Sequence, residues 1–192
     1  MKPRSGAGTT VGNPWFAFEV DRPGKSKGKA DMKTLANVTL WFAAIGCGVA
    51  GGIYFIFSAT VMSSLGRIAP EAGIAAMNAM SADIVRSAFM PLFIGTTIAG
   101  TVLALLSLFQ WNEPGSLPIL AGGLLYFFGM FIVTVAFNVP LNNSLAAVDP
   151  NSADGLSFWA TYLRDWTMWN HVRTVASIAA SVLFTAALAA RS

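Results

Sequence analysis

Hydrophobic positions fill four long runs of this chain, and the charged residues are confined to the stretches that flank those runs. The four uncharged intervals lie between Lys33 and Arg67, Arg86 and Glu113, Glu113 and Asp149, and Arg173 and Arg191. They hold 33, 26, 35 and 17 residues. A helix needs about 20 apolar residues to cross the hydrocarbon core of a bilayer. The pattern therefore predicts four membrane-spanning helices, at about 35–62, 88–111, 117–139 and 168–190.

The connection between the first two runs has a helical pattern of its own. Pro70 and Glu71 suit the first turn of a helix, and apolar residues from Ile74 to Ala88 then recur at helical spacing. We expect a short amphipathic helix in this first loop, lying on the membrane or capping the bundle. The fold class is thus all-α, an integral membrane four-helix bundle.

Two features mark the ends of the later spans. Pro140 lacks a backbone donor and disfavours helix at the residue before it, so the third span should stop or kink there. The 17 residues after Arg173 are barely enough to cross, so the fourth helix should begin well before Arg173. Residues 149–157 have the composition of a loop that ends in a helix cap.

The first run contains Gly46-Cys-Gly48-Val-Ala-Gly51, which matches the dinucleotide pattern G-x-G-x-x-G letter for letter. That fingerprint needs a preceding strand and a helix N-terminus for the pyrophosphate, and an apolar span offers neither. The glycines are interpreted as helix-packing positions instead. Gly48 and Gly52 form a small-xxx-small pair, which allows close approach of helices in lipid.

Composition agrees with a single membrane domain over residues 34–192. Apolar residues make up 55% of the chain and charged residues 11%, against roughly a quarter charged in soluble domains. Residues 1–33 are rich in Gly, Pro, Lys and Ser and hold seven of the twelve basic residues, which predicts a disordered basic tail. A basic tail beside a span is typical of membrane topology or lipid contact, so the net charge of +3 does not indicate a nucleic-acid partner.

The orientation in the cell membrane depends on the N-terminus. With residues 1–31 present, eight basic residues lie on the side of the two termini and four on the other, which favours cytoplasmic termini. Met32 directly before a hydrophobic run is also typical of the start of a membrane protein. We therefore interpret residues 1–31 as an upstream extension, and a chain that starts at Met32 reverses the charge preference.

Alternation of four spans gathers the polar side chains at one end of the bundle. The residues expected there are Ser58, Arg86, Asn138, Asn142, Asn143, Asn170, His171 and Arg173. At 100° per residue, one face of the helix that leads into the fourth span, about 80° wide, carries Trp159, Tyr162, Trp166, Asn170 and Arg173. His171 lies about 100° from Asn170 on that helix. A pocket at this end, with Phe57 as a further wall, would suit a flat apolar ligand bearing a few oxygens.

A purely structural interpretation stays open at this point. Trp and Tyr at a membrane edge are ordinary interface anchors, Arg173 can extend to lipid phosphates, and His171 can be a hydrogen-bonded interfacial residue. One histidine and one cysteine, Cys47, argue against bis-histidine haem and the usual zinc sites. No metal or cofactor is therefore expected.

Three motifs together resemble a known family. Phe57-Ser58 closes the first span, Asn138-Val-Pro140-Leu-Asn142 closes the third, and Trp166-x-x-Trp169-Asn170-His171-x-Arg173 opens the fourth. In this order they are similar to the anthrone oxygenase-like (DUF1772) membrane proteins, over about residues 35–190. Characterised fungal members are associated with oxidation of polyketide anthrones to anthraquinones by O₂, so the resemblance implies a cofactor-independent monooxygenase of a small aromatic substrate.

The resemblance also implies roles for the residues at the polar end. His171 would be the base that makes an enolate, since histidine gains and loses a proton near neutral pH. Arg173, Asn138 and Asn142 would bond the enolate oxygen or a peroxide, and Trp159 and Trp166 would sandwich the rings.

The predicted site residues and the alternative functions complete these expectations. The catalytic set is His171, Arg173 and Asn170, and the substrate-binding set is Asn138, Asn142, Trp159, Tyr162, Trp166, Ser58 and Phe57. The alternative is a non-enzymatic membrane protein that binds a lipid, a quinone or a partner subunit at the same end. A transporter is less favoured because no acidic residue lies within a span.

Overall fold

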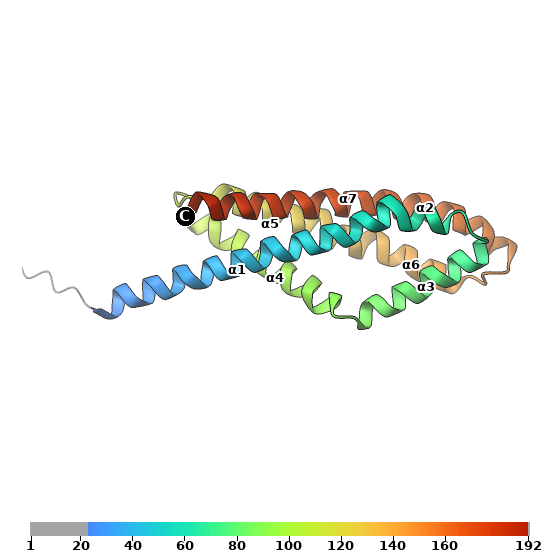
Figure 1. Cartoon of the computed structure of the whole chain (residues 1–192), viewed down its shortest axis with the longest axis horizontal. Helices are drawn as coiled ribbons and strands as arrows, with labels where there is room; N and C mark the ends of the chain where they lie inside the picture. The colour runs from blue at the N-terminus through green and yellow to red at the C-terminus, as the bar shows by residue number, and fades with distance from the viewer. Residues whose placement is uncertain (1–22, 192) are drawn as a thin grey trace, which may run out of the picture.

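The computed structural model describes residues 23–191, and every regular element in that part of the chain is a helix (Figure 1). Four helical stretches are long and apolar enough to cross a membrane: Asp31–Leu65, Phe89–Phe109, Ser116–Ala147 and Ala153–Arg191. The four-helix architecture predicted from the uncharged intervals is thus confirmed, and the protein is a multi-pass membrane protein of the helical class.

The elements follow one another along the chain in a simple up-and-down order. They are α1 Pro23–Ile56, the π-helix η2 Phe57–Val61, α2 Met62–Leu65, α3 Pro70–Arg86, α4 Phe89–Phe109, α5 Ser116–Tyr126, the π-helices η3 Phe127–Ile132 and η4 Thr134–Asn138, α6 Val139–Ala147 and α7 Ala153–Arg191. Helix α7 runs the length of the bundle, and α1 packs beside it (Figure 1).

The first helix begins earlier than expected. Residues 1–22, with most of the predicted disordered tail, lie outside the described residues, but α1 already begins at Pro23 and includes Asp31 and Lys33. Proline suits the first turn of a helix, and no later proline interrupts the segment. Once the apolar helix has formed, each added residue loses conformational entropy but gains one backbone hydrogen bond. The helix can therefore extend toward the N-terminus as far as Pro23.

The third span does not stop at Pro140. It passes through η3 and η4 and continues in α6 as far as Ala147. Pro140 lies in the first turn of α6, directly after the π-helical stretch, where a missing backbone donor costs little. This correction matters for the site, because it keeps Asn138 and Asn142 on one continuous helix.

The fourth helix begins at Ala153, well before Arg173, so the tryptophan-rich stretch forms its first turns. Ser152 caps it, since its Oγ accepts a hydrogen bond of 3.0 Å from the backbone N–H of Gly155. The expected loop at 149–157 is therefore shorter than its composition indicated. All five residues of the predicted face, Trp159, Tyr162, Trp166, Asn170 and Arg173, are buried.

Helix α3 is the amphipathic helix predicted for the first loop. Its apolar residues Ile74 and Met77 are buried, and its Gly73 lies against the Trp159 ring, where a Cβ would come within 2.6 Å of Cζ2. It packs on α6 and α7 at the end of the bundle where α7 begins (Figure 1). One end of the bundle is thereby covered by a helix that is not among the membrane-spanning helices.

Helices α1 and α7 approach closely through glycine, but not through the expected pair. A Cβ on Gly51 would lie 2.9 Å from Cγ1 of Ile178, and Gly48 faces Ser181. A Cβ on Gly52 would have no neighbour within 4 Å, so this glycine faces away from the other helices. The close contact in lipid is therefore made by Gly48 and Gly51.

Candidate functional site

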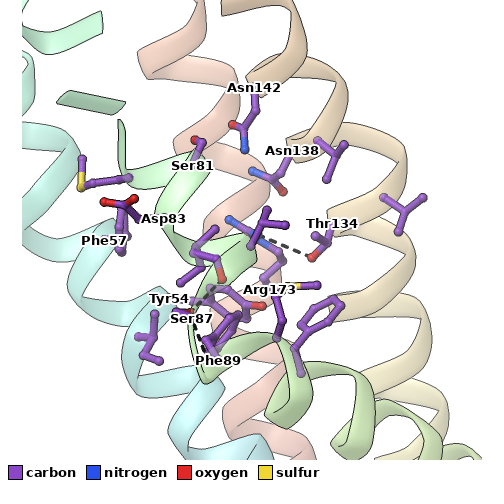
Figure 2. Close-up of a pocket in the computed structure, with 18 of the residues that line it drawn as sticks. Tyr54, Phe57, Ser81, Asp83, Ser87, Phe89, Thr134, Asn138, Asn142 and Arg173 are labelled. Atoms are coloured by element: carbon purple, nitrogen blue, oxygen red, sulfur yellow. Dashed lines mark hydrogen bonds between the residues drawn. The ribbon is translucent and has the colours of Figure 1, made fainter. Parts of the chain in front are cut away.

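A cavity of about 570 Å³ opens between α1, α3, α4, α7 and the third span. Its walls are mainly apolar and aromatic, and its polar lining residues are Ser81, Asp83, Ser87, Thr134, Asn138, Asn142 and Arg173. Figure 2 shows the polar residues arriving from different helices. Ligand sites of this size typically combine apolar walls with a few placed polar groups.

Arg173 is the one basic residue among the described residues that line this cavity. Its side chain is only 5% exposed, and its guanidinium lies 4.4 Å from the ring centre of Tyr54 and 5.0 Å from that of Trp166. Nη2 donates to Asn170 Oδ1 at 2.7 Å, Nη1 donates to Thr134 Oγ1 at 3.5 Å, and Nε has no partner among the described residues. These ring faces and neutral oxygens only partly offset the cost of burying the charge.

No carboxylate forms an ion pair with Arg173 in the described part of the chain, where the one salt bridge joins Arg164 to Asp165. A charged side chain inside a membrane bundle is costly and is usually paired. Arg173 therefore leaves a positive charge facing the cavity, which can stabilise negative charge on a ligand there.

Asn170 fixes the position of this guanidinium. It is fully buried, and its Nδ2 donates to the backbone oxygen of Tyr54 and to Ser58 Oγ, both at 2.7 Å. Its Oδ1 accepts the bond from Arg173. Because every polar atom of the amide is used, Asn170 is a positioning residue that joins α7 to α1, and Ser58 supports it from outside the cavity.

The two asparagines of the third span that line the cavity, Asn138 and Asn142, differ in which side-chain atoms remain unpaired. Asn142 Oδ1 accepts from Tyr162 Oη at 2.8 Å and from Trp166 Nε1 at 2.9 Å. Asn138 Nδ2 donates to the backbone oxygen of Trp166 at 3.2 Å, while its buried Oδ1 has no partner among the described residues. Asn138 therefore holds an unpaired, buried acceptor within the wall of the cavity.

The backbone around the cavity departs from regular α-helix. Phe57 lies in η2, Phe131 in η3, and Thr134 and Asn138 in η4, so all three π-helical segments contribute to the lining. Single π-helical turns are rare and occur frequently at functional sites. Their concentration around one cavity supports the choice of this cavity as the candidate site.

The structure does not bring His171 together with the other predicted catalytic residues. His171 is exposed and lines a separate groove between α7 and the end of the first span, with Arg67 and Arg164. The reason is its position on the helix, about 100° from Asn170. In this arrangement it has no access to a ligand bound beside Arg173.

The aromatic residues of the predicted face also fall into two groups, because only some of them line the cavity. Trp166 and Phe57 line the cavity with ring centres 5.7 Å apart. Trp159 instead stacks on Tyr162 at 5.6 Å beneath α3, and Tyr162 stacks on Trp166 at 6.3 Å. Tyr162 thus lies between the two tryptophans, which therefore do not form a sandwich for one ligand.

Several residues of the cavity had no distinct signal in the sequence. They are Asp83, Phe89, Phe131, Thr134 and above all Tyr54, whose ring lies against the Arg173 guanidinium. The only available sign of Tyr54 was the aromatic character of the end of the first span. Asp83 was visible only as a polar position away from the apolar face of α3.

A comparison with family models matches residues 85–183 to the model described as anthrone oxygenase. The chain belongs to the anthrone oxygenase family. The matched segment is just over half of the 192 residues and contains Asn138, Asn142, Trp166, Asn170 and Arg173. Comparisons with curated proteins and with solved structures gave no match. Within this anthrone oxygenase family member, Tyr54 and Ser58 complete the site from outside the matched segment.

Proposed function

We propose that the protein is a monooxygenase that oxidises a small anthrone-like aromatic ketone with O₂ in the Arg173 cavity. The observation that carries this proposal is the buried guanidinium of Arg173, which faces an apolar cavity without a carboxylate partner in the described chain. Such a charge stabilises an anion that forms during a reaction far better than it would in water. The family membership points to the same class of chemistry.

The cavity suits a flat, mostly apolar molecule. Its volume of about 570 Å³ lies within the usual range for small-molecule sites, and its walls include Tyr54, Phe57, Phe89 and Trp166. A ketone oxygen in the cavity would lie beside the Arg173 guanidinium, which lines it.

The chemistry follows from the acidity of the anthrone methylene, which lies between two aryl rings across from the ketone. Removal of one proton places the electron pair on the ketone oxygen as an enolate, which Arg173 stabilises. The enolate carbon then adds O₂, the peroxide takes up the proton to give a hydroperoxide, and loss of water leaves the quinone. One O₂ is consumed and one water released for each substrate.

We assign the proton acceptor to Asp83 rather than to His171. Asp83 is the only acidic residue that lines the cavity within the described chain, whereas His171 lines the other groove. A carboxylate and a guanidinium that line one cavity can supply a base and an electrostatic stabiliser for the same substrate. Asp83 would also return the proton to the peroxide.

The test is O₂ uptake and quinone formation by the purified protein in lipid nanodiscs, with an anthrone as substrate. Arg173→Met keeps side-chain length without the charge and should lower the rate by about 10²–10³-fold. Arg191→Met, at the far end of α7, is the matched control and should match the wild type. Anthrone binding without turnover above the rate of empty nanodiscs would instead support a ligand-binding protein and overturn the enzymatic proposal.

A further inference from the structure

We propose that the second groove of the protein binds the phosphate-bearing head group of an anionic phospholipid from the surrounding bilayer. This groove has a volume of about 560 Å³ and lies between α7 and the segment from η2 to the residues after α2. Its basic residues are Arg67, Arg164 and His171, and its hydroxyl-bearing residues include Ser58, Ser63 and Thr167. The proposal does not rest on the proposed oxidation.

The groove carries a net positive charge. Arg67 donates from Nη1 to Ser63 Oγ at 3.2 Å and from Nη2 to Ser64 Oγ at 3.1 Å, and both of these acceptors are neutral hydroxyls. Arg164 pairs with Asp165, whose Oδ1 lies 2.7 Å from Arg164 Nε. Within residues 23–191, Arg67 thus has no ion pair, and the charge of Arg164 is only partly neutralised by an exposed contact. Two guanidiniums with nearby hydroxyls are a donor set that suits phosphate oxygens.

The apolar surface next to the groove shows what else the ligand must carry. Exposed apolar residues of α7 recur at intervals of three or four on both sides of His171: Met168, Val172, Val175, Ile178 and Val182. This spacing places them on one helical face, and Arg164 and His171 lie on the same face at its basic end. On the neighbouring α1, Ile45, Val49 and Ile56 are exposed as well.

A basic group at one end of an exposed apolar strip matches a molecule with an anionic head and hydrocarbon tails. A free phosphate ion would use the basic residues but leave the strip uncovered. Basic pockets between membrane helices bind the head groups of anionic lipids for this reason. An anionic phospholipid, with its head beside Arg67 and its acyl chains along α1 and α7, fits both features.

The test is native mass spectrometry of the full-length protein titrated with phosphatidylglycerol or with phosphatidylcholine of the same acyl chains. Two Arg contacts should give phosphatidylglycerol an advantage of about tenfold in the apparent Kd of the first bound lipid. Arg67→Gln should lower this preference severalfold, and Arg67→Lys should keep most of it. Arg86→Gln removes the same charge from an exposed residue outside the groove and should leave the preference intact.

Three results would overturn the proposal. The first is equal retention of the two lipids by the wild type. The second is an equal loss of preference in Arg67→Gln and Arg86→Gln, which would show only general charge attraction. The third is displacement of phosphatidylglycerol by inorganic phosphate at similar concentration, which would indicate an ion site. Each variant is first checked for an unchanged thermal unfolding transition, and Arg67→Lys provides the comparison if Arg67→Gln does not fold.

Discussion

Arg173 and Asn170 lie one turn apart on α7 and are joined by a hydrogen bond of 2.7 Å from Nη2 to Oδ1. Asn170 is itself held by the backbone oxygen of Tyr54 and by Ser58 Oγ. The guanidinium is therefore positioned by the packing of α7 on α1, two helices that are distant in the sequence. Its charge, its positioning and the packing around it can each be changed separately.

Neutralising Arg173 within the cavity should lower turnover sharply while leaving the fold intact. Thr134 Oγ1 lies 3.5 Å from Nη1, so Thr134→Asp would place a carboxylate beside the guanidinium (Figure 2). We expect a rate about 10²-fold lower and a melting temperature no lower than that of the wild type. Thr134→Asn is nearly isosteric with the aspartate variant and should retain most of the rate. Equal rates in the two variants would contradict the electrostatic role.

Removing the positioning amide should affect both stability and rate. Asn170→Ala deprives Arg173 of an acceptor and leaves the backbone oxygen of Tyr54 without this donor. Loss of such buried bonds costs about 1–3 kcal/mol of unfolding free energy and should slow turnover at least tenfold. Thermal unfolding in detergent and initial rates of O₂ uptake measure the two effects. Ser58→Ala, which removes only the outer support, should show a smaller effect in both assays.

The proton acceptor can be identified by a pair of conservative variants. Asp83→Asn should lower turnover of the anthrone by about 10²–10⁴-fold, because the amide cannot accept the proton. His171→Gln should leave turnover within about twofold of wild type, since His171 faces the other groove. Initial rates of quinone formation decide between them. The reverse pattern would return the role to His171 and require a rearrangement of α7.

Helix packing can be tested with two neighbouring glycines. Gly51→Ala would press a methyl group against Ile178 and Ser177 and should destabilise the protein by about 1–3 kcal/mol. Gly52→Ala points into open space and should be neutral or stabilising by up to about 1 kcal/mol, since alanine favours helix. Thermal unfolding of the two variants in the same detergent measures this difference. Similar melting temperatures would contradict the observed packing of α1 on α7.

The sequence supported the four spans and one face of α7 because both follow from strong local rules. Charges are costly in a bilayer, so uncharged intervals reveal spans, and the 3.6-residue period places Trp159, Tyr162, Trp166, Asn170 and Arg173 on one face. The same period had already placed His171 apart from Asn170. Its assignment to the same ligand came from the resemblance and not from helical geometry.

What the sequence could not indicate depends on how helices meet. The position of Tyr54 over the guanidinium requires the register of α1 against α7, and no local pattern encodes it. The covering of Trp159 depends on where α3 packs. The π-helical turns before Pro140 are a backbone adjustment without a sequence signature, and they decide that the third span continues. Asp83 enters the cavity only because α3 folds back on the bundle.

The central claim is that Arg173 stabilises the enolate of the substrate, and anaerobic absorption spectroscopy tests it most directly. An anthrone mixed with wild-type protein in nanodiscs without O₂ should show the long-wavelength band of the enolate, in proportion to the protein added. Arg173→Met should show only the neutral ketone, and admission of O₂ should convert the wild-type band into that of the quinone. A wild-type spectrum of neutral ketone alone, or an equal enolate band in Arg173→Met, would contradict the account.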